Sequence, residues 1–207
     1  MTQELEPKNR SIRQGLALFV SNFGNPFSLL FLLTLYSCLK FLPIDHAIRI
    51  IAGIFFLAIL PTGLFIVFNV KRGAYTNYDV SNQSQRRSLY YFSLVIIVLI
   101  LAGLIYFKEP PFIIGGSLAA FTLLLLSYLV NLKLKCSLHT SFSIFIAISF
   151  LQLNIYWSMG LFVFSLIMAW SRLELHRHTF QEVIAGAILG ITVGIAFHYI
   201  MQPYLAL

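Results

Sequence analysis

The residues best suited to chemistry lie in a polar segment near the C-terminal end of the sequence, at 171–182 (SRLELHRHTFQE). His178 and Glu182 are four residues apart, so they share one face if both belong to the start of a helix. A carboxylate that binds one imidazole nitrogen fixes the tautomer and leaves the other nitrogen free as a base or a nucleophile. Arg172 and Arg177 add positive charge nearby. The segment predicts either an activated histidine or a polar boundary loop whose side chains contact lipid head groups.

A second polar segment, at 133–141 (KLKCSLHTS), opens a long apolar run. Ser137 or Thr140 could cap the N-terminus of the helix that begins there. An anion at this helix N-terminus would meet free backbone N–H groups and the positive end of the helix dipole. His139 would lie where it could protonate a leaving group, although a single histidine at a helix start is also typical of an interfacial residue.

Two basic pairs, Lys71-Arg72 and Arg86-Arg87, bound a third polar segment. Such residues commonly anchor the ends of membrane helices, and arginine side chains also bind phosphate oxygens in bidentate fashion. Together, the polar segments offer histidines, a carboxylate and several guanidinium groups. This set suits phosphoryl transfer, in which catalysis depends on positioning and on charge stabilisation.

A divalent-metal site is the competing interpretation, because imidazole and carboxylate groups are metal ligands. The candidate ligands are His139, His176, His178 and Glu182. His176 and His178 are two residues apart and would diverge on a helix. We therefore expect no metal at this site.

The composition shows what kind of protein must position these residues. Hydrophobic residues make up 59% of the 207 residues, charged residues make up 10%, and the mean hydropathy is +0.86. A soluble domain carries roughly 45–50% apolar and about 25% charged residues. A soluble protein of this size could not bury so much apolar surface, which excludes a soluble enzyme, a nucleic-acid-binding domain and a disordered chain. The net charge of +7 therefore indicates lipid head groups and phosphates as partners, and no nucleic acid.

Long apolar runs predict that the chain crosses a membrane as helices, since a span needs roughly 20 residues. We expect an all-α, polytopic transmembrane helix bundle with seven spans, six being the alternative. Residues 1–24 are assigned to a polar N-terminus with an interfacial segment, and residues 25–207 to a single transmembrane domain. The predicted spans are the runs at about 27–44, 47–70, 88–107, 111–132, 140–154, 156–170 and 183–202.

With this count, the three polar segments lie on the same side of the membrane as the N-terminus, because two spans separate each segment from the next. Of the 14 Lys and Arg residues, eleven fall on that side and three on the other. Basic residues are enriched in cytoplasmic loops, so the count favours a cytoplasm-facing site. We expect an integral multi-pass protein of a bacterial cytoplasmic (inner) membrane.

The spacing of the last segment resembles the third signature of the type 2 phosphatidic acid phosphatase superfamily, S-R-x5-H-x3-D. The matching positions are Ser171, Arg172, His178 and Glu182. Glu182 departs from the family pattern in being one methylene longer than Asp. The resemblance covers roughly residues 71–195, and this third signature is its most specific part.

Residues 135–142 (KCSLHTSF) are similar to the second signature, P-S-G-H with a Thr-Ser-Phe continuation. Cys136 and Leu138 stand where the family has Pro and Gly. Both residues are departures from the family pattern.

Residues 79–87 lie where the first signature, K-x6-R-P, is expected, but the match is weak. No Lys lies seven residues before either arginine, since Asp79 precedes Arg86 and Val80 precedes Arg87. The phosphate-binding Lys is therefore absent or supplied by Lys71, and the phosphate-binding arginine is Arg86 or Arg87.

The resemblance implies a membrane phosphatase that needs no metal or other cofactor. His178 would be the nucleophile and form a phosphohistidine, Glu182 would orient it, and His139 would protonate the leaving oxygen and later activate water. The phosphate would be bound by Arg172, Arg86 or Arg87, Lys71 and the backbone around Ser137. The substrate would be a lipid phosphate or diphosphate of the bilayer, such as phosphatidate, phosphatidylglycerol phosphate or a polyprenyl diphosphate. The alternative is a catalytically degenerate lipid-phosphate-binding or transport protein of the same fold.

Glycines recur every four residues in the last predicted span, at Gly186, Gly190 and Gly194. Small residues at this spacing let two helices approach closely within a membrane. We expect these glycines to pack the last helix inside the bundle near the site, and not to form a dimer.

Overall fold

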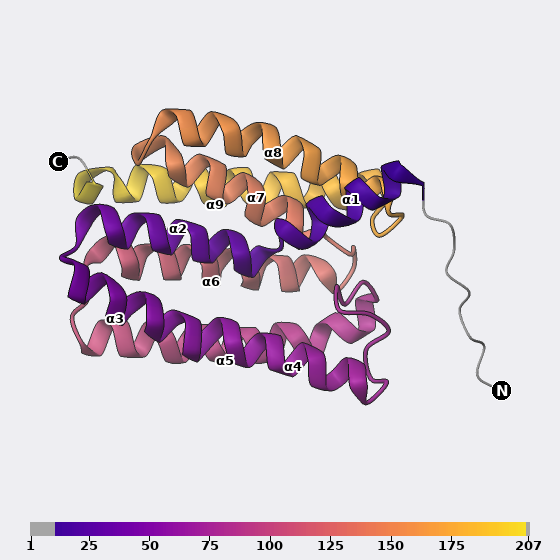
Figure 1. Ribbon diagram of the computed structural model, residues 1–207, viewed down its shortest axis with the longest axis horizontal. Coiled ribbons are helices and arrows are strands. Elements are labelled where there is room, and N and C mark those ends of the chain that lie inside the picture. Colours follow the sequence, from indigo (N-terminus) through magenta and orange to yellow (C-terminus); the bar gives the residue numbers. More distant parts are fainter. Residues whose placement is uncertain (1–10, 206–207) are drawn as a thin grey trace.

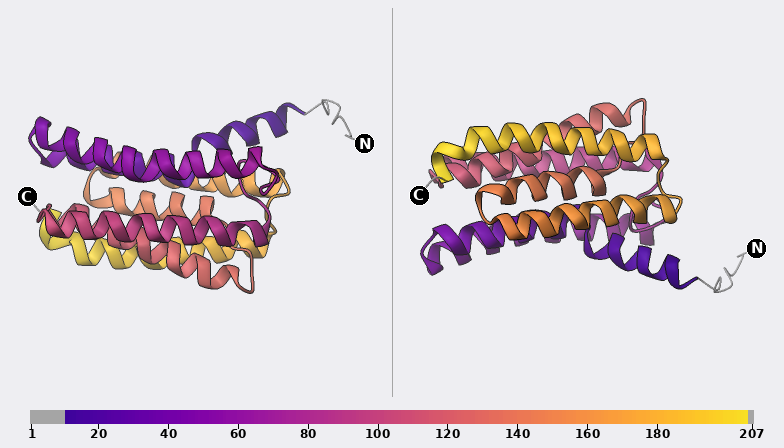
Figure 2. Two further views of the ribbon diagram at one scale, coloured as in Figure 1. Left: turned by 90° about the horizontal axis from the view of Figure 1, so that it is seen from below. Right: turned by 90° about the horizontal axis from the view of Figure 1, so that it is seen from above.

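The computed structural model describes residues 11–205 as a bundle of helices, and no strand occurs among them (Figure 1). This confirms the predicted fold class of a multi-pass α-helical membrane protein. Five helical stretches are long and apolar enough to cross a membrane: Ile44–Lys71, Gln83–Tyr106, Pro111–Asn131, Ile155–Glu174 and Phe180–Tyr204. In Figure 1, α7, α8 and α9 lie above α2 and α6, and α3, α4 and α5 lie below them, while Figure 2 shows α2, α3 and α4 on the opposite side of the bundle from α5, α6 and α9.

The first crossing of the chain consists of two helices that meet at a bend, where a capping residue starts the second helix. Helix α1 (Ile12–Phe23) meets α2 (Pro26–Phe41) at an angle of 50°, and counting this bent pair as one span gives six. Asn25 caps α2 by accepting a hydrogen bond from the Ser28 backbone N–H at 3.0 Å. The proline that follows it is favoured at the first position of a helix, where no N–H partner is needed.

A π-helical turn accommodates Pro61 in the next crossing. The stretch comprises α3 (Ile44–Ile54), the π-helical segment Phe55–Ile59 and α4 (Leu60–Lys71). A proline inside a helix removes one backbone hydrogen bond, and a local π turn lets the chain continue across it. The two following crossings are the regular helices α5 (Gln83–Tyr106) and α6 (Pro111–Asn131).

Helix α7, the fifth helical pass in chain order when α1–α2 and α3–α4 count as one each, is short and buried. Helix α7 (Leu138–Ser149) continues as the 3-10 turn Phe150–Gln152, and it packs against α2, α6, α8 and α9. Nearly all of its side chains are buried, and its serine hydroxyls donate hydrogen bonds to backbone carbonyls of the preceding turn, which satisfies them inside the bundle. The chain reverses at Asn154, whose side chain caps α8 (Ile155–Glu174). The predicted hairpin is therefore present as two helices, but only α8 is long enough to be a candidate span, because Leu138–Gln152 is shorter. The described chain thus has five candidate spans, or six with the bent pair, and not the expected seven.

The last helix, α9 (Phe180–Leu205), contacts α7 through its glycine face. A Cβ atom placed on Gly186 would lie 2.5 Å from the Ser137 carbonyl oxygen, and one on Gly190 would overlap the Ser141 carbonyl oxygen. Gly194 faces the side chain of Ile148, which would lie 3.0 Å from an added Cβ atom. The predicted internal packing of these glycines is confirmed.

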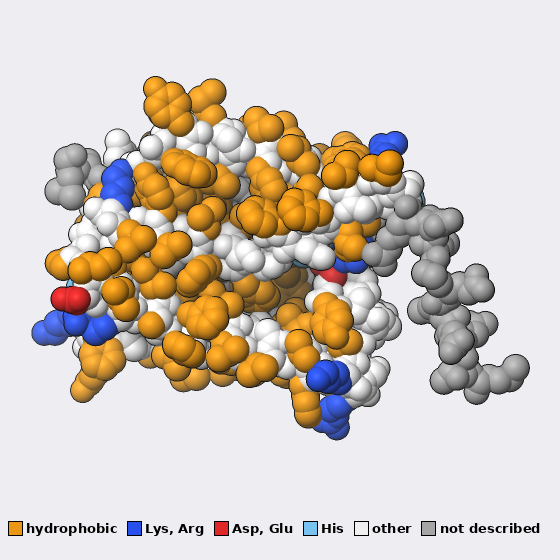
Figure 3. Space-filling view, in the orientation of Figure 1, with side chains coloured by type: hydrophobic (Ala, Val, Ile, Leu, Met, Phe, Trp, Pro, Cys, Tyr) orange, Lys and Arg blue, Asp and Glu red, His pale blue; other side chains and the backbone are white. Residues whose placement is uncertain are grey.

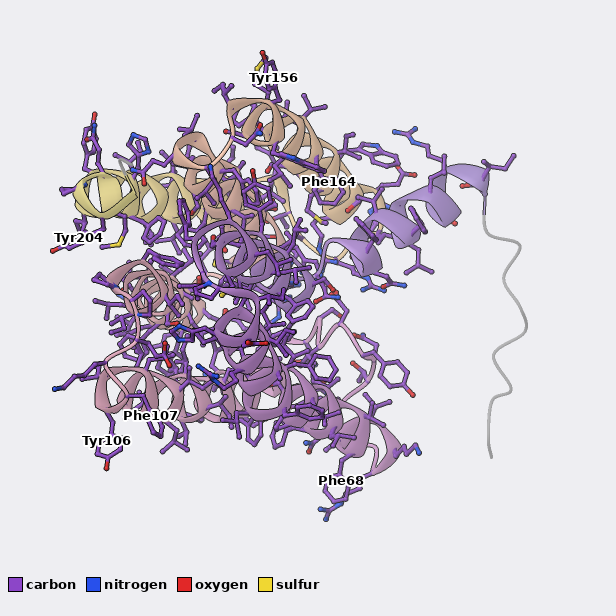
Figure 4. All side chains as sticks on the ribbon, turned by 60° about the vertical axis from the view of Figure 1, so that its left-hand side comes forward. Phe68, Tyr106, Phe107, Tyr156, Phe164 and Tyr204 are labelled. Carbon is purple, nitrogen blue, oxygen red and sulfur yellow. The ribbon has the colours of Figure 1, made fainter. Side chains whose placement is uncertain are left out.

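The loops between α4 and α5, α6 and α7, and α8 and α9 lie together at one end of the bundle (Figures 1 and 2). Apolar side chains cover the flank between the ends (Figure 3). Outward-pointing aromatic side chains, typical of a membrane interface, include Tyr106, Phe107 and Tyr204 near the opposite end (Figure 4). The fold thus gathers the polar loops at one membrane boundary.

Replacing Gly190 by Ala should destabilise the protein by about 1–3 kcal/mol, because overpacking forces the α7 and α9 backbones apart. Thermal unfolding in detergent measures the effect. Gly160→Ala on α8 is the matched control, since a Cβ there meets no atom within 4 Å. Equal unfolding temperatures for the two variants would contradict the close α7–α9 packing.

Candidate active site

The polar end of the bundle brings together ionisable side chains from the three polar segments of the chain. They are Asp79, Arg86, Lys135, His139, Arg172, Arg177, His178 and Glu182. Most of these side chains are buried, although they carry charge or can acquire it. Charged groups at membrane depth are costly and are usually functional.

His178 is held from both sides of its ring. Its Nδ1 lies 2.8 Å from Glu182 Oε2, and its Nε2 lies 3.1 Å from Arg86 Nη2. A guanidinium group can only donate hydrogen bonds, so Nε2 must be the unprotonated acceptor and Nδ1–H must donate to Glu182. The two partners therefore assign the tautomer that leaves the Nε2 lone pair available to an electrophile.

Glu182 is fixed by the start of α9. Its Oε2 accepts a hydrogen bond from the Thr179 backbone N–H at 3.2 Å, while Thr179 Oγ1 accepts one from the Glu182 N–H at 3.4 Å. This reciprocal arrangement is a capping box, which the spacing T-x-x-E favours at a helix N-terminus. The Glu182 carbonyl accepts a hydrogen bond from the Ser137 N–H at 3.1 Å, which joins the start of α9 to the start of α7.

Arg86 occupies the first turns of α5 and is buried in the protein. Its Nε donates to the Val80 carbonyl at 2.8 Å, and its Nη1 donates to the Cys136 carbonyl at 3.0 Å. With His178 on its remaining nitrogen, this guanidinium links three polar loops. Arg87 is the next residue and is exposed. The structure therefore brings Arg86 into the site and leaves Arg87 on the surface.

Asp79 is the centre of a second group of contacts. Its Oδ2 lies 2.5 Å from Arg172 Nη2 and 2.7 Å from Arg177 Nη1, and its Oδ1 lies 3.4 Å from His139 Nε2. Arg172 is completely buried and also donates to Ser21 Oγ of α1 at 2.5 Å. The Nε of Arg172 has no hydrogen-bond partner among the described residues.

The Asp79 carboxylate stands where the first signature of the resembling family has a lysine, seven residues before Arg86. The adjacent Val80 has a φ of 47°, a left-handed conformation that β-branched residues rarely adopt. Such strain is tolerated where surrounding contacts fix the backbone, and the bond from Arg86 to the Val80 carbonyl does so. An internal anion therefore lies among the guanidinium groups that the sequence suggested for phosphate.

Lys71 and Ser137, which the sequence also predicted as phosphate ligands, do not offer a free side chain or N–H group next to Asp79 and His178. Lys71 is exposed at the end of α4, outside the contacts around Asp79 and His178, so it does not take the place of the missing lysine. Ser137 is buried and caps α7, and its N–H is engaged by Glu182. Within the described chain, the N–H groups of Leu138 and His139 in the first turn of α7 have no hydrogen-bond partner.

Two further contributors, Lys135 and Ser21, were not predicted from the sequence. Lys135 lies within the basic segment at 133–141, whereas Ser21 reaches the site only through a tertiary contact. Lys135 Nζ donates to the Arg177 carbonyl at 2.6 Å and lies 3.8 Å from Glu182 Oε2. Burial lowers the pKa of Lys135. Ser21 belongs to the segment that the sequence assigned to the N-terminus, yet α1 packs on α8 and brings Ser21 to Arg172.

The electrostatic environment keeps His178 neutral and Asp79 ionised. Burial lowers the pKa of His178, and the nearby charges of Arg86, Arg172 and Lys135 lower it further. Burial alone would raise the pKa of Asp79, but the interactions with His139, Arg172 and Arg177 more than offset it and hold that pKa below its usual range. The site can therefore offer an uncharged imidazole nitrogen next to several cations.

The described side chains contain no group of three or more His, Cys, Asp and Glu arranged to hold a metal ion. His176 is exposed in the turn after α8, away from the His178–Glu182 pair. In comparisons with known proteins, no family model, curated protein or solved structure matches this chain.

The lowered pKa of His178 predicts a loss of stability as the pH falls from 7 to 5. The unfolded chain binds a proton at this histidine near pH 6.5 while the folded protein does not, so stability is present above that pH and falls below it. The slope contributed by one proton is at most about 1.4 kcal/mol per pH unit. Asp79 does not contribute to the change in stability between pH 7 and 5, because its carboxyl group stays ionised throughout this range.

Melting temperatures of the wild type and of His178→Gln between pH 7.5 and 5 measure this contribution. We expect a flatter pH dependence in His178→Gln and an unchanged one in His176→Gln, which alters an exposed histidine. Parallel curves for the wild type and His178→Gln would show that His178 is protonated equally in both states.

Proposed function

We propose that this chain is a membrane phosphatase that hydrolyses a lipid phosphate or diphosphate through a phosphohistidine at His178. The observation that carries the proposal is the fixed imidazole, with Nδ1–H on Glu182 and the Nε2 lone pair directed at Arg86. The resemblance of residues 71–195 to the type 2 phosphatidic acid phosphatases supports the same reaction. The candidate substrates are phosphatidate, phosphatidylglycerol phosphate and a polyprenyl diphosphate.

In the first step, Nε2 of His178 attacks the phosphorus atom and the bond to the leaving oxygen breaks. His139 gives its proton to that oxygen, so the lipid leaves as an alcohol or a monophosphate. The phosphorylated imidazole becomes positively charged, and Glu182 stabilises it through the hydrogen bond to Nδ1. Arg86 exchanges its bond to Nε2 for a bond to a phosphate oxygen as the attack begins.

In the second step, water attacks phosphorus and the nitrogen–phosphorus bond breaks. His139 takes a proton from the water molecule, which restores the acid for the next cycle, and inorganic phosphate leaves. Arg172 and Arg86 neutralise the charge on the phosphate oxygens throughout both steps. Guanidinium groups thereby supply the charge stabilisation of the reaction.

The incoming phosphate takes the place of the Asp79 carboxylate. Asp79 is bound by Arg172 and Arg177, the same kind of bidentate donors that recognise phosphate. The positive charge of the resting site is thus partly neutralised by Asp79, and a substrate must compete with this internal anion. The unpartnered Nε of Arg172 offers a further donor to the phosphate.

A second candidate is a lipid-phosphate-binding protein without turnover. The observation that favours it is the carboxylate of Asp79 at the position of a lysine ammonium, which reverses the charge of one side chain in the anion site. We propose that either protein belongs to a bacterial inner membrane with the site towards the cytoplasm, because nine of the 12 Lys and Arg residues in the described chain lie on the side of the site.

Phosphate release from lipid phosphates by the purified protein, with a chelator present, tests the phosphatase. His178→Ala should reduce release to background. Arg86→Ala should lower turnover by about a hundredfold or more, the effect of removing one transition-state donor. Arg87→Ala is the matched control, because it alters an exposed arginine one residue away. Equal losses in the two arginine variants, with folding intact, would contradict the assigned role of Arg86.

Asp79→Asn should strengthen binding of inorganic phosphate or orthovanadate by about tenfold or more, since a charged competitor is replaced by a neutral amide. Inhibition of lipid hydrolysis or calorimetry in the presence of each anion measures the change. Asp45→Asn, at an exposed position in the first turn of α3, controls for the loss of one negative charge. Unchanged anion affinity in a folded Asp79→Asn protein would show that Asp79 does not occupy the phosphate position.

A further inference from the structure

A cavity of about 790 Å³ begins at the candidate site and runs into the bundle. Asp79, Arg86 and His139 line its polar end. Its far end is lined by Cys38, Ile100 and Ile113 of α2, α5 and α6. The volume lies in the upper part of the range for small-molecule sites, which is roughly 300–1,000 Å³.

The cavity is long and lies along the helices. On α5 its lining extends from Arg86 to Ile100, and at 1.5 Å per residue this corresponds to roughly 20 Å. The hydrocarbon core of a bilayer is about 30 Å thick, so the cavity reaches most of the way across it. A chain inside the cavity would therefore run parallel to the helices and across the bilayer.

Most of the wall between the two ends is apolar. It includes Leu30, Leu33, Ile66, Ile97 and Ala120. Protein interiors are packed at the density of organic crystals, so a space of this size is not left by ordinary side-chain packing. Water fills a cavity only where several polar groups can bind it, which these side chains do not provide. An apolar chain is the occupant that matches this wall.

The cavity is also reached from the side of the bundle. Its lining includes Asn22 and Asn25 at the bend between α1 and α2, and Ile59 and Gly63 at the start of α4. A hollow is visible on the apolar flank between these helices, with charged atoms at one rim (Figure 3). A lipid in the bilayer can thus enter sideways with its head group at the polar end.

We propose that this cavity binds one apolar chain of the substrate, while the phosphate lies at Arg86, Arg172 and His178. The inference rests on the proposed function and locates the part of the protein that binds the long apolar chain of its substrate. A phosphate entering through the cavity approaches Asp79 from the interior of the bundle. His178 lies on the opposite side of Asp79 and Arg86, in a smaller surface pocket with Lys135 and Glu182. If the phosphate displaces the Asp79 side chain, the cavity and the surface pocket that holds His178 become continuous.

Two glycines that line the cavity allow a test in which a larger side chain fills part of its volume. Gly116 of α6 and Gly63 of α4 both line it, and a Cβ on either would meet no atom within 4 Å. Leucine at these positions therefore projects into the space without an initial clash. Gly160 of α8 is the matched control, since it is exposed on the flank and equally free of neighbours. All three replacements exchange Gly for Leu within a helix, so they share the same gain in helix propensity.

The experiment compares hexadecyl phosphate with butyl phosphate in lipid nanodiscs, measuring binding by native mass spectrometry and turnover by phosphate release. We expect Gly116→Leu and Gly63→Leu to weaken binding of hexadecyl phosphate by about tenfold or more. Binding of butyl phosphate should not change, and Gly160→Leu should match the wild type with both compounds.

Hexadecyl phosphate binding that is equal in Gly116→Leu, Gly63→Leu and Gly160→Leu would overturn the cavity proposal, whatever the turnover. Equal weakening of both phosphates in the cavity variants would also overturn it, because the loss would then concern the phosphate site. Chain-dependent binding without any turnover would support the cavity and reject the phosphatase. The two proposals can therefore fail separately.

Discussion

The buried ion pair between Arg172 and Asp79 is the interaction on which the polar end of the molecule depends. Arg172 has no exposed surface, and an unpaired charge in such a position would be strongly unfavourable. Asp79 supplies the opposite charge from the loop after α4, while Ser21 adds a hydrogen bond from α1. One guanidinium thus joins the first helix, the loop and α8. The same carboxylate holds Arg177 and His139, so the placement of the candidate acid depends on it as well.

Helix α7 gives this network its second support. Its close contact with the glycine face of α9 brings Ser137 and Glu182 within hydrogen-bond distance. The starts of two helices therefore meet, and they carry His139 on one side and the His178–Glu182 pair on the other. A larger side chain at Gly186 or Gly190 would separate these starts. The close packing of α7 against α9 therefore determines how His139 lies relative to His178 and Glu182.

Much of the fold follows from the sequence because the apolar runs are long and the breaks between them are polar. The His178–Glu182 pair was also predictable, since the four-residue spacing and the T-x-x-E capping box both favour a helix that starts at this point. The sequence did not predict which of Arg86 and Arg87 enters the site. The choice depends on the rotation of α5, and an apolar helix that faces lipid as well as protein has little hydrophobic periodicity to reveal that rotation.

The role of Asp79 and the contribution of Ser21 depend on tertiary contacts that no local pattern encodes. Ser21 lies 151 residues before Arg172 in the chain. The position of Asp79 is set by a loop with a left-handed Val80, a conformation that residue propensities argue against. Lys71 is near the site in the sequence, but it ends α4 on the exposed side of the same loop. These differences arise where the chain is neither helical nor apolar.

The most direct test of the account is to trap the reaction intermediate. The purified protein is mixed with a radiolabelled lipid phosphate, stopped in alkali after a few milliseconds to seconds, and digested so that the labelled residue can be identified by mass spectrometry. The account predicts a phosphoryl group on His178, formed as fast as phosphate is released and absent from His178→Ala. Phosphate release without a labelled protein, or a label that persists in His178→Ala, would contradict it.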